Sequence, residues 1–266
     1  MKTPLLRYRL DPVALFEDVG NDKHEPPYPW QMKALRSTSK RQLYLTTRQG
    51  GKSSVAATKS LHVAMFSPGS LVLMVSPSQK QSEEIFRKAR NAYRDLGKPM
   101  GVAAEGTRHI ELGNGSRIES LPGTEKSNVG YTAALVVIDE AARTDSELVE
   151  AIMPTVAVSG GSVIALSTPK GARGWFYELW HSPQVDTFWE RHRATADDVP
   201  SPELAAMVEE AMVTRGPRHV QENYYCSFLA DEEAFFDPED LERSLTLADP
   251  DEPLWFPERN ASLGQL

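Results

Sequence analysis

The chain has 266 residues, of which 40% are hydrophobic and 25% are charged, a composition typical of a globular domain. Its apolar runs are too short to span a bilayer, and its N-terminal residues carry charges throughout. We therefore expect neither a membrane segment nor a secretory signal. Cys226 is the only cysteine, which excludes an internal disulfide and favours a reducing compartment, the cytoplasm.

The net charge of −8 is distributed unevenly. Residues 231–266 contain 11 acidic residues against two arginines, so residues 1–230 carry a net charge of +1. A neutral body can still present local basic patches to phosphates. The charge therefore neither excludes nor favours a nucleic-acid partner.

Strand and helix patterns alternate along most of the chain. Prolines are frequent up to residue 30, which predicts extended or loop structure, and residues 31–38 then predict a short helix. Apolar residues at helical spacing recur between the predicted strands. Asn114-Gly115 is typical of a tight turn and predicts a hairpin within 108–121. Apolar runs bounded by turn residues predict buried strands at 43–45, 71–75, 133–138 and 163–166. This alternation is typical of an α/β fold with a mainly parallel sheet and helices on both faces.

The C-terminal part differs in character. Apolar runs disappear after Ser182, and two helical stretches predict a small helical appendage over residues 183–244. Acidic residues and prolines dominate residues 245–266, which predicts a linker or tail. Residues 1–182 are expected to form the core.

The segment 46–54 carries the first chemical signal. An apolar strand leads into Gly50-Gly51, followed by Lys52 and Ser53 at the start of a helical pattern. In a phosphate-binding loop, backbone N–H groups and the helix N-terminus face the anion, the lysine reaches the terminal phosphates, and the hydroxyl holds Mg²⁺. The usual pattern has a glycine where this chain has Thr46, so the segment is not specific by itself.

The predicted strand at 133–138 is followed by Asp139 and Glu140. Because α/β folds bind ligands at the C-terminal edge of the sheet, we expect both carboxylates at that edge. Beside a phosphate loop, Asp139 would hold Mg²⁺ directly or through water, and Glu140 would polarise the attacking water. The alternative is an ordinary acidic pair at a helix start, which the loop about 90 residues upstream makes less favourable.

The predicted strand at 163–166 ends in Ser167 and Thr168. Hydroxyls at that edge could sense the γ-phosphate and connect its hydrolysis to movement. A simple cap ahead of Pro169 is the alternative, and it would be preferred without the other two motifs.

Five segments occur in an informative order, from about residue 28 to residue 230: WQ, RQGGKS, a hairpin with NGS, YTAALVVIDEAA and ALSTPKGARGWFYELW. Their order resembles that in the ATPase domain of tailed-bacteriophage terminase large subunits, the motors that package DNA. In that family the phosphate loop commonly lacks its first glycine and carries an arginine where Arg48 stands. The resemblance implies a P-loop NTPase of the ASCE type, with ATP and Mg²⁺ as cofactors.

The resemblance also implies an N-terminal adenine-binding segment. Gln31 matches the glutamine that reads adenine, and Trp30 or Tyr28 is available to stack on the base. For Trp30, simple packing in the core is the alternative.

Catalytic roles follow in the same way. Glu140 matches the catalytic glutamate, Arg48 matches a loop arginine that senses the nucleotide, and Thr168 belongs to the coupling motif. Asp139 and Ser53 match the Mg²⁺ ligands. The nucleotide-binding positions implied near the phosphates are Gln49, Gly50, Gly51, Lys52, Ser53, Ser54 and Ser167.

One position departs from the family pattern. Many relatives have an arginine that acts in trans on a neighbouring subunit, where this chain has Val129. Lys126, Arg143 and Arg173 are the other candidates for that charge, although each is more often a surface or helix-end charge. An arginine finger contributes roughly 10³–10⁵ in rate in other phosphoryl-transfer systems, so without one this subunit would hydrolyse ATP poorly.

The resemblance implies partners as well. It predicts a ring of like subunits that moves double-stranded DNA, with the portal protein and the small terminase subunit as partners. The expected location is the bacterial host cytoplasm and, transiently, the procapsid portal. Complete relatives continue into a nuclease domain, so we expect a separate nuclease domain or subunit and no nuclease activity from these residues. Two alternatives stay open: a helicase-related ATPase, which would need a second lobe, and a nucleotide-binding assembly module with little or no hydrolysis.

Overall fold

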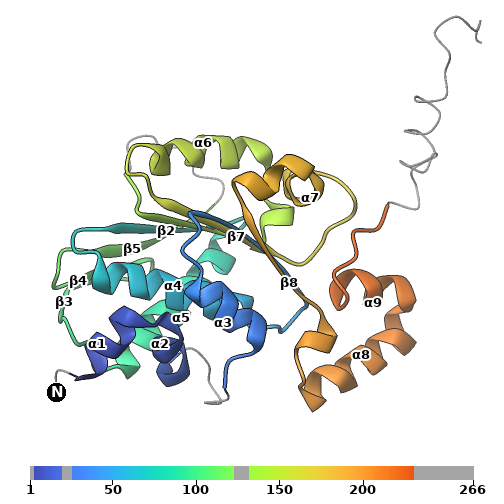
Figure 1. Cartoon of the computed structure of the whole chain (residues 1–266), viewed down its shortest axis with the longest axis horizontal. Coiled ribbons are helices and arrows are strands. Elements are labelled where there is room, and N and C mark those ends of the chain that lie inside the picture. The colour runs from blue at the N-terminus through green and yellow to red at the C-terminus, as the bar shows by residue number, and fades with distance from the viewer. Residues whose placement is uncertain (1–2, 20–25, 123–131, 231–266) are drawn as a thin grey trace, which may run out of the picture. The chain divides into compact units, whose positions relative to one another are not determined.

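The computed structural model describes residues 3–19, 26–122 and 132–230 (Figure 1). The residues up to Leu229 belong to one unit. Among the described helices, none is long and apolar enough to cross a membrane. The predicted tail at 245–266 lies outside the described residues.

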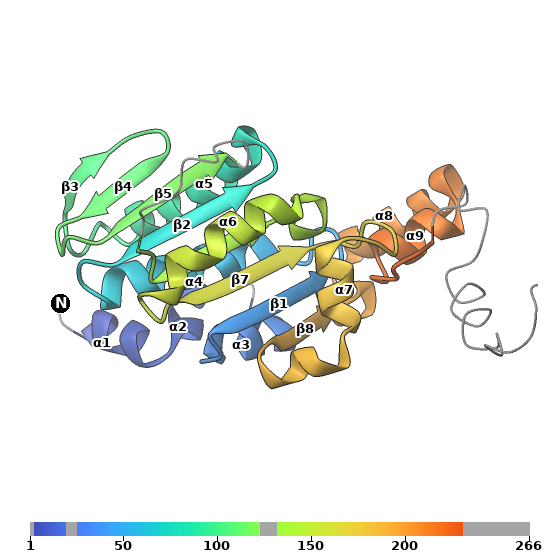
Figure 2. The same ribbon diagram turned by 90° about the horizontal axis from the view of Figure 1, so that it is seen from above.

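In the described part of the chain, eight strands form one sheet in the order β3-β4-β5-β2-β6-β7-β1-β8 (Figure 2). The pairs from β5 to β8 are parallel, whereas β3–β4 and β4–β5 are antiparallel. The strands are β1 (Arg41–Thr46), β2 (Leu71–Ser76), β3 (Val102–Glu105), β4 (His109–Leu112), β5 (Arg117–Pro122), β6 (Leu135–Asp139), β7 (Ser162–Ser167) and β8 (Glu190–Ala194). The sheet confirms the mainly parallel α/β prediction, and the predicted hairpin at Asn114-Gly115 joins β4 to β5.

Helices cover both faces of the sheet, as Figure 1 shows. One face packs against α1 to α5, through strand residues such as Tyr44, Met74 and Val137. The other packs against α6 and α7, through alternate residues such as Leu45 and Val136. The α-helices are α1 (Thr3–Leu10), α2 (Pro12–Val19), α3 (Pro29–Arg36), α4 (Lys52–Phe66), α5 (Gln79–Asp95), α6 (Ser146–Ala157), α7 (Trp175–His181), α8 (Pro202–Arg215) and α9 (Pro217–Asn223). The described residues also form the 3₁₀ helices η1 (Ala141–Arg143), η2 (Pro183–Thr187) and η3 (Ala196–Asp198).

The N-terminal prediction of extended or loop structure is wrong for residues 3–19, although residues 26–28 do lack regular secondary structure. Two helices, α1 and α2, occupy 3–10 and 12–19. Pro4 and Pro12 lie in the first turn of these helices, where a missing N–H removes no helical hydrogen bond. The apolar run Val13 to Phe16 is buried in the main core, so tertiary packing stabilises α2.

The strand β8 is a second departure. It lies within the range 183–244 that the sequence predicts to be helical, yet it pairs in parallel with β1. Its sequence is Glu-Arg-His-Arg-Ala, and only His192 and Ala194 are buried. Because β8 is the edge strand of the described sheet, it needs no continuous apolar run. The helices α8 and α9 follow this strand and share a small core around Leu204 and Val220.

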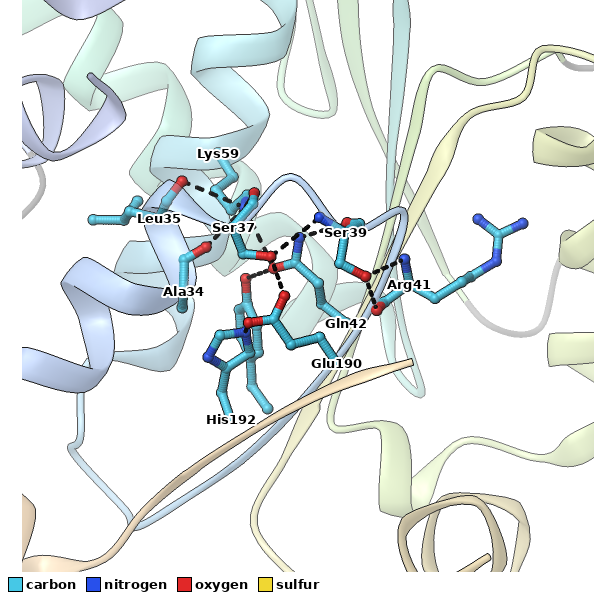
Figure 3. Close-up of polar contacts among 10 residues, drawn as sticks. Ala34, Leu35, Ser37, Ser39, Arg41, Gln42, Lys59, Glu190 and His192 are labelled. Carbon is cyan, nitrogen blue, oxygen red and sulfur yellow. Dashed lines mark hydrogen bonds and ion pairs between the residues drawn. The ribbon is translucent and has the colours of Figure 1, made fainter. Parts of the chain in front are cut away.

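A half-buried lysine joins α3 to the rest of the core, as Figure 3 shows. The ammonium of Lys59, on α4, donates to the backbone oxygens of Ala34 at 2.8 Å and Ser37 at 2.9 Å, at the C-terminal end of α3. It also lies 3.3 Å from Oε1 of Gln42, which accepts a hydrogen bond from the hydroxyl of Tyr44 at 2.6 Å. Burial lowers the pKa of Lys59 to about 8. Lys59 therefore links α3, which carries Gln31, to β1 and α4, the two elements that flank the phosphate loop.

Candidate active site

The phosphate loop connects β1 to α4, and its backbone has the required special conformation. Gly51 caps α4 with φ 81°, and a Cβ atom at this position would lie 2.4 Å from Nε2 of Gln31. Two loop N–H groups are bound outside the loop: Thr47 donates to the oxygen of Ala194 at 2.7 Å and Arg48 donates to that of Asn223 at 3.0 Å. The loop is therefore held by β8 and by α9.

A cavity of about 530 Å³ lies beside this loop. One wall is polar and comes from the loop and the first turn of α4: Gln49, Gly51, Lys52, Ser53 and Ser54. The other walls include the rings of Phe16 and Tyr28 and the side chain of Leu204. An apolar region joined to a loop of N–H groups and a lysine suits a ligand with a flat ring at one end and phosphates at the other.

The structure separates the two predicted aromatic candidates. Trp30 is buried against the edge of Tyr44, with ring centroids 6.3 Å apart, and does not line the cavity. Tyr28 lines it. Trp30 is therefore a core residue. Of the two candidates only Tyr28 lines the cavity, and its stacking on a base stays a prediction.

Gln31 lies between α3 and the phosphate loop. Its Oε1 accepts a hydrogen bond from the N–H of Tyr28 at 2.9 Å, and its Nε2 donates to the oxygen of Gly50 at 3.3 Å. The side chain is buried, yet it lines the cavity. These contacts use one of the two N–H donors and one of the two lone pairs of the amide, and reading of adenine by Gln31 stays a prediction.

Asp139 and Glu140 lie at the C-terminal edge of the sheet, as predicted. In the strand register Asp139 is opposite Leu166, so it lies beside the end of β7. Glu140 adopts a left-handed conformation with φ 50° and ψ 44°, which turns the chain sharply after β6. This conformation is uncommon for a residue with a Cβ atom and is often found at functional sites.

Asp139 is almost fully buried, with 7% of its surface exposed. Burial, reinforced by the charge of Glu140 and opposed by that of Lys52, raises the pKa of Asp139 to about 6. Its Oδ1 accepts a hydrogen bond from the N–H of Glu140 at 3.0 Å. A desolvated carboxylate of this kind is stabilised by a cation, and Mg²⁺ prefers carboxylate and hydroxyl oxygens. Asp139 and the hydroxyl of Ser53 therefore fit a Mg²⁺ site chemically.

Glu140 is held between two cations. Nζ of Lys52 lies 3.4 Å from its Oε1, and the guanidinium of Arg143 donates to its Oε2 at 2.7 Å. The same NH1 group of Arg143 lies 3.2 Å from the hydroxyl of Thr168. Lys52 thus contacts Glu140 directly, and Arg143 connects Glu140 to Thr168.

The sequence predicts Arg143 only as one source of a charge acting in trans, and the structure shows it in contact with Glu140 of its own chain. The sequence does contain a signal for this contact, because the two residues are three positions apart and lie one helical turn from each other. Lys126 and Val129 lie outside the described residues.

The remaining predicted positions differ in their surroundings. Ser167 and Thr168 are buried at the end of β7, and the hydroxyl of Ser167 has no hydrogen-bond partner among the described residues. Gly50 lies in the loop and accepts from Gln31. Arg48 is exposed and does not line the cavity. Its predicted role as a nucleotide sensor stays a prediction.

The sequence of the chain matches a known family over most of its length. Residues 43–260 match the family described as terminase large subunit, T4likevirus-type, N-terminal. The large terminase subunit of Thermus phage G20c is 30% identical over 192 residues, which cover 65% of this chain and 39% of that protein. The same values apply to the large subunit of Thermus virus P23-45. The match thus spans well under half the length of these relatives.

Solved structures share the fold. The ATPase domain of the Thermus phage P74-26 large terminase matches with a TM-score of 0.66 and 26% identity, over 80% of this chain and 97% of that domain. A large terminase from another thermophilic bacteriophage, solved in complex with ATP-γ-S, matches with a TM-score of 0.62 over 77% of this chain and 53% of that chain. Its identity of 15% supports the fold alone. The chain therefore belongs to the phage terminase large subunit family, and its described residues form the P-loop NTPase fold of the ATPase domain.

Proposed function

We propose that this domain hydrolyses Mg²⁺-bound ATP and that the hydrolysis drives double-stranded DNA into a viral procapsid. The observation that carries the proposal is the meeting of Lys52, from the phosphate loop, with Glu140, from the end of β6, at 3.4 Å. A phosphate-binding lysine and a carboxylate that positions water are two of the groups on which phosphoryl transfer to water depends. The large terminase solved with ATP-γ-S, which has the same fold, supports ATP as the ligand.

The chain's own groups divide the chemistry between them. The loop N–H groups and Lys52 would bind the β- and γ-phosphates, and Glu140 would orient the attacking water. Asp139 and Ser53 would hold Mg²⁺, which when bound offsets the charge of the phosphates. Without nucleotide, Lys52 and Arg143 both neutralise Glu140. A γ-phosphate competes for Lys52, so binding of ATP leaves Glu140 with Arg143 alone.

The wider role follows from membership of the family. We propose that the subunits form a ring on duplex DNA at the portal protein, together with the small terminase subunit and a nuclease domain or subunit. The place of action would be the host cytoplasm and, transiently, the procapsid portal. Gripping of phosphates rather than reading of bases suits a motor that must move along any sequence.

The decisive experiment compares two variants in separate assays of ATP binding and ATP turnover. Glu140→Gln should retain ATP binding and lose at least about 100-fold in kcat, the usual contribution of a positioned acid–base group. Lys52→Ala should lose binding as well. Lys40→Ala, an exposed lysine just before β1, is the matched control and should behave as wild type. Turnover at the wild-type rate in both site variants would refute the proposal.

A second function, nucleotide binding without hydrolysis, is favoured by one observation, the valine at position 129. ATP binding with no turnover, even with DNA present and at high protein concentration, would support this assembly role. A helicase-type ATPase is less favoured, because the described residues contain a single sheet and no second lobe. Unwinding of a forked duplex by this chain alone would support it.

A further inference from the structure

A smaller cavity opens beside the candidate active site. It has a volume of about 280 Å³ and lies between residues 142–146, from η1 to the start of α6, and residues 170–175 in the segment after β7. The indole N–H of Trp175 donates to the oxygen of Thr144 at 2.8 Å and joins the two walls. The cavity is therefore built by two segments that both begin at the C-terminal edge of the sheet.

Three cationic side chains line this cavity: Arg143, Lys170 and Arg173. Asp145 is the carboxylate in the same lining, and Glu140 lies behind Arg143. Lys170 and Arg173 are exposed, so a large partner could reach them from solvent. We call the surface formed by Arg143, Lys170 and Arg173 the basic groove.

Backbone contacts hold the segment that carries Lys170 and Arg173. The N–H of Gly171 donates to Oε1 of Glu222 at 2.8 Å, and the N–H of Ala172 donates to the oxygen of Leu229 at 3.0 Å. With the Trp175 bond on the other side, the segment is anchored at both ends of its turn. The two cations are thus presented from a supported loop, which lowers the entropy cost of binding an anion there.

We propose that the basic groove binds the phosphates of the DNA backbone, an assignment that rests on the proposed translocase function. Lysine and arginine side chains that converge from two segments on a small open cavity suit single phosphates of a continuous strand. The cavity has about half the volume of the cavity beside the phosphate loop. An arginine finger, by contrast, needs one side chain that projects into a neighbour's site.

The test is duplex binding by the double variant Lys170→Ala/Arg173→Ala, measured by fluorescence anisotropy with DNA of arbitrary sequence over a range of salt. The logarithm of the association constant falls linearly with the logarithm of the salt concentration, and each lost phosphate contact should make this slope less steep by about 0.9. The affinity at low salt should fall at least about tenfold. Lys40→Ala removes an exposed charge before β1 and should change neither quantity. The melting temperature of each variant checks the fold.

A gain of affinity provides an independent readout. Asp145→Asn removes the carboxylate from the groove and keeps a residue that caps helices well, and the side chain of Asp145 makes no capping hydrogen bond to lose. This variant should bind duplex DNA more tightly than wild type. A misfolded variant would not show that result.

The outcomes separate this inference from the proposed function. The proposal is wrong if the double variant binds DNA with the affinity and salt dependence of wild type. It is also wrong if the wild-type protein binds no duplex DNA. If the double variant binds DNA as wild type does but loses ATP turnover in the absence of DNA, Lys170 and Arg173 act on the nucleotide of a neighbouring subunit instead. Weakened DNA binding with the DNA-free turnover unchanged is the result we expect. The proposed ATPase function is tested independently, by the ATP turnover of Glu140→Gln.

Discussion

At the scale of single residues, Asp139 shows how position changes chemistry. Its burial raises its pKa from 3.8 to about 6. The folded protein therefore binds a proton at Asp139 more tightly than the unfolded chain does. The resulting stabilisation is fully present below about pH 4 and is lost as the pH rises through about 6.

We predict that Asp139→Asn removes this pH dependence in protein free of Mg²⁺ and nucleotide. Between pH 4 and pH 7 the free energy of unfolding of wild type should fall relative to the variant, by up to about 3 kcal/mol for a shift of this size. Urea unfolding at four pH values measures the difference. Parallel curves for the two proteins over this range would contradict the assigned environment of Asp139.

At the scale of elements, the position of α3 depends on a lysine from another helix. Lys59 binds the carbonyl oxygens at the end of α3, as Figure 3 shows, while Gln31 at the other end of α3 bonds to Gly50 of the phosphate loop. The helix therefore connects the ammonium of Lys59 to the phosphate loop. An isolated helix of eight residues is marginally stable, so these contacts at its ends and the packing of Trp30, Ala34 and Leu35 in the core stabilise α3 together.

We predict that Lys59→Met lowers the free energy of unfolding by about 1–3 kcal/mol, because it leaves buried carbonyl oxygens without a donor. Urea unfolding measures this loss, and Lys40→Met is the matched control at an exposed position. We also expect weaker ATP binding, since α3 carries Gln31 and is preceded by Tyr28. Equal stability of Lys59→Met and Lys40→Met would show that the capping contacts contribute little.

At the scale of the whole molecule, Arg143 joins the ends of β6 and β7 at the edge of the sheet. Arg143 contacts Glu140 within its own chain, which favours a role in cis, as a residue that positions the carboxylate. In the ring that we propose, a charge acting in trans would then come from a residue other than Arg143.

We predict that Arg143→Ala lowers kcat for ATP without a matching change in KM, because Arg143 touches Glu140 and not the nucleotide cavity. Mixing this variant with Glu140→Gln then distinguishes the two roles. A cis residue leaves every mixed site defective, so no activity returns. If Arg143 acted across subunits, some mixed sites would combine an intact Glu140 with an intact Arg143, and turnover would recover.

Much of the fold and half of the site could be predicted because their signals are local. The buried strands are short apolar runs, and the phosphate loop needs contiguous glycine, lysine and serine to turn the backbone toward an anion. Asp139 and Glu140 follow their strand directly, so the parallel sheet alone places them at its C-terminal edge. The N-terminal helices escaped prediction because their prolines favour loop structure in a reading of the sequence, although both prolines lie in a first helical turn. The strand β8 escaped it because four of its five residues are charged or ionisable at the edge of the sheet and form no apolar run.

The sequence by itself determined the order of the motifs, the alternation of strands and helices, and the membership of a P-loop family. Only the tertiary structure decided that Trp30 lies in the core while Tyr28 faces the cavity, and that Arg143 joins Glu140 to Thr168. It also decided that a polar segment completes the sheet as β8. The physical reason is range: periodicity and loop chemistry depend on neighbours in the chain, whereas burial and ion pairing depend on which distant segments meet.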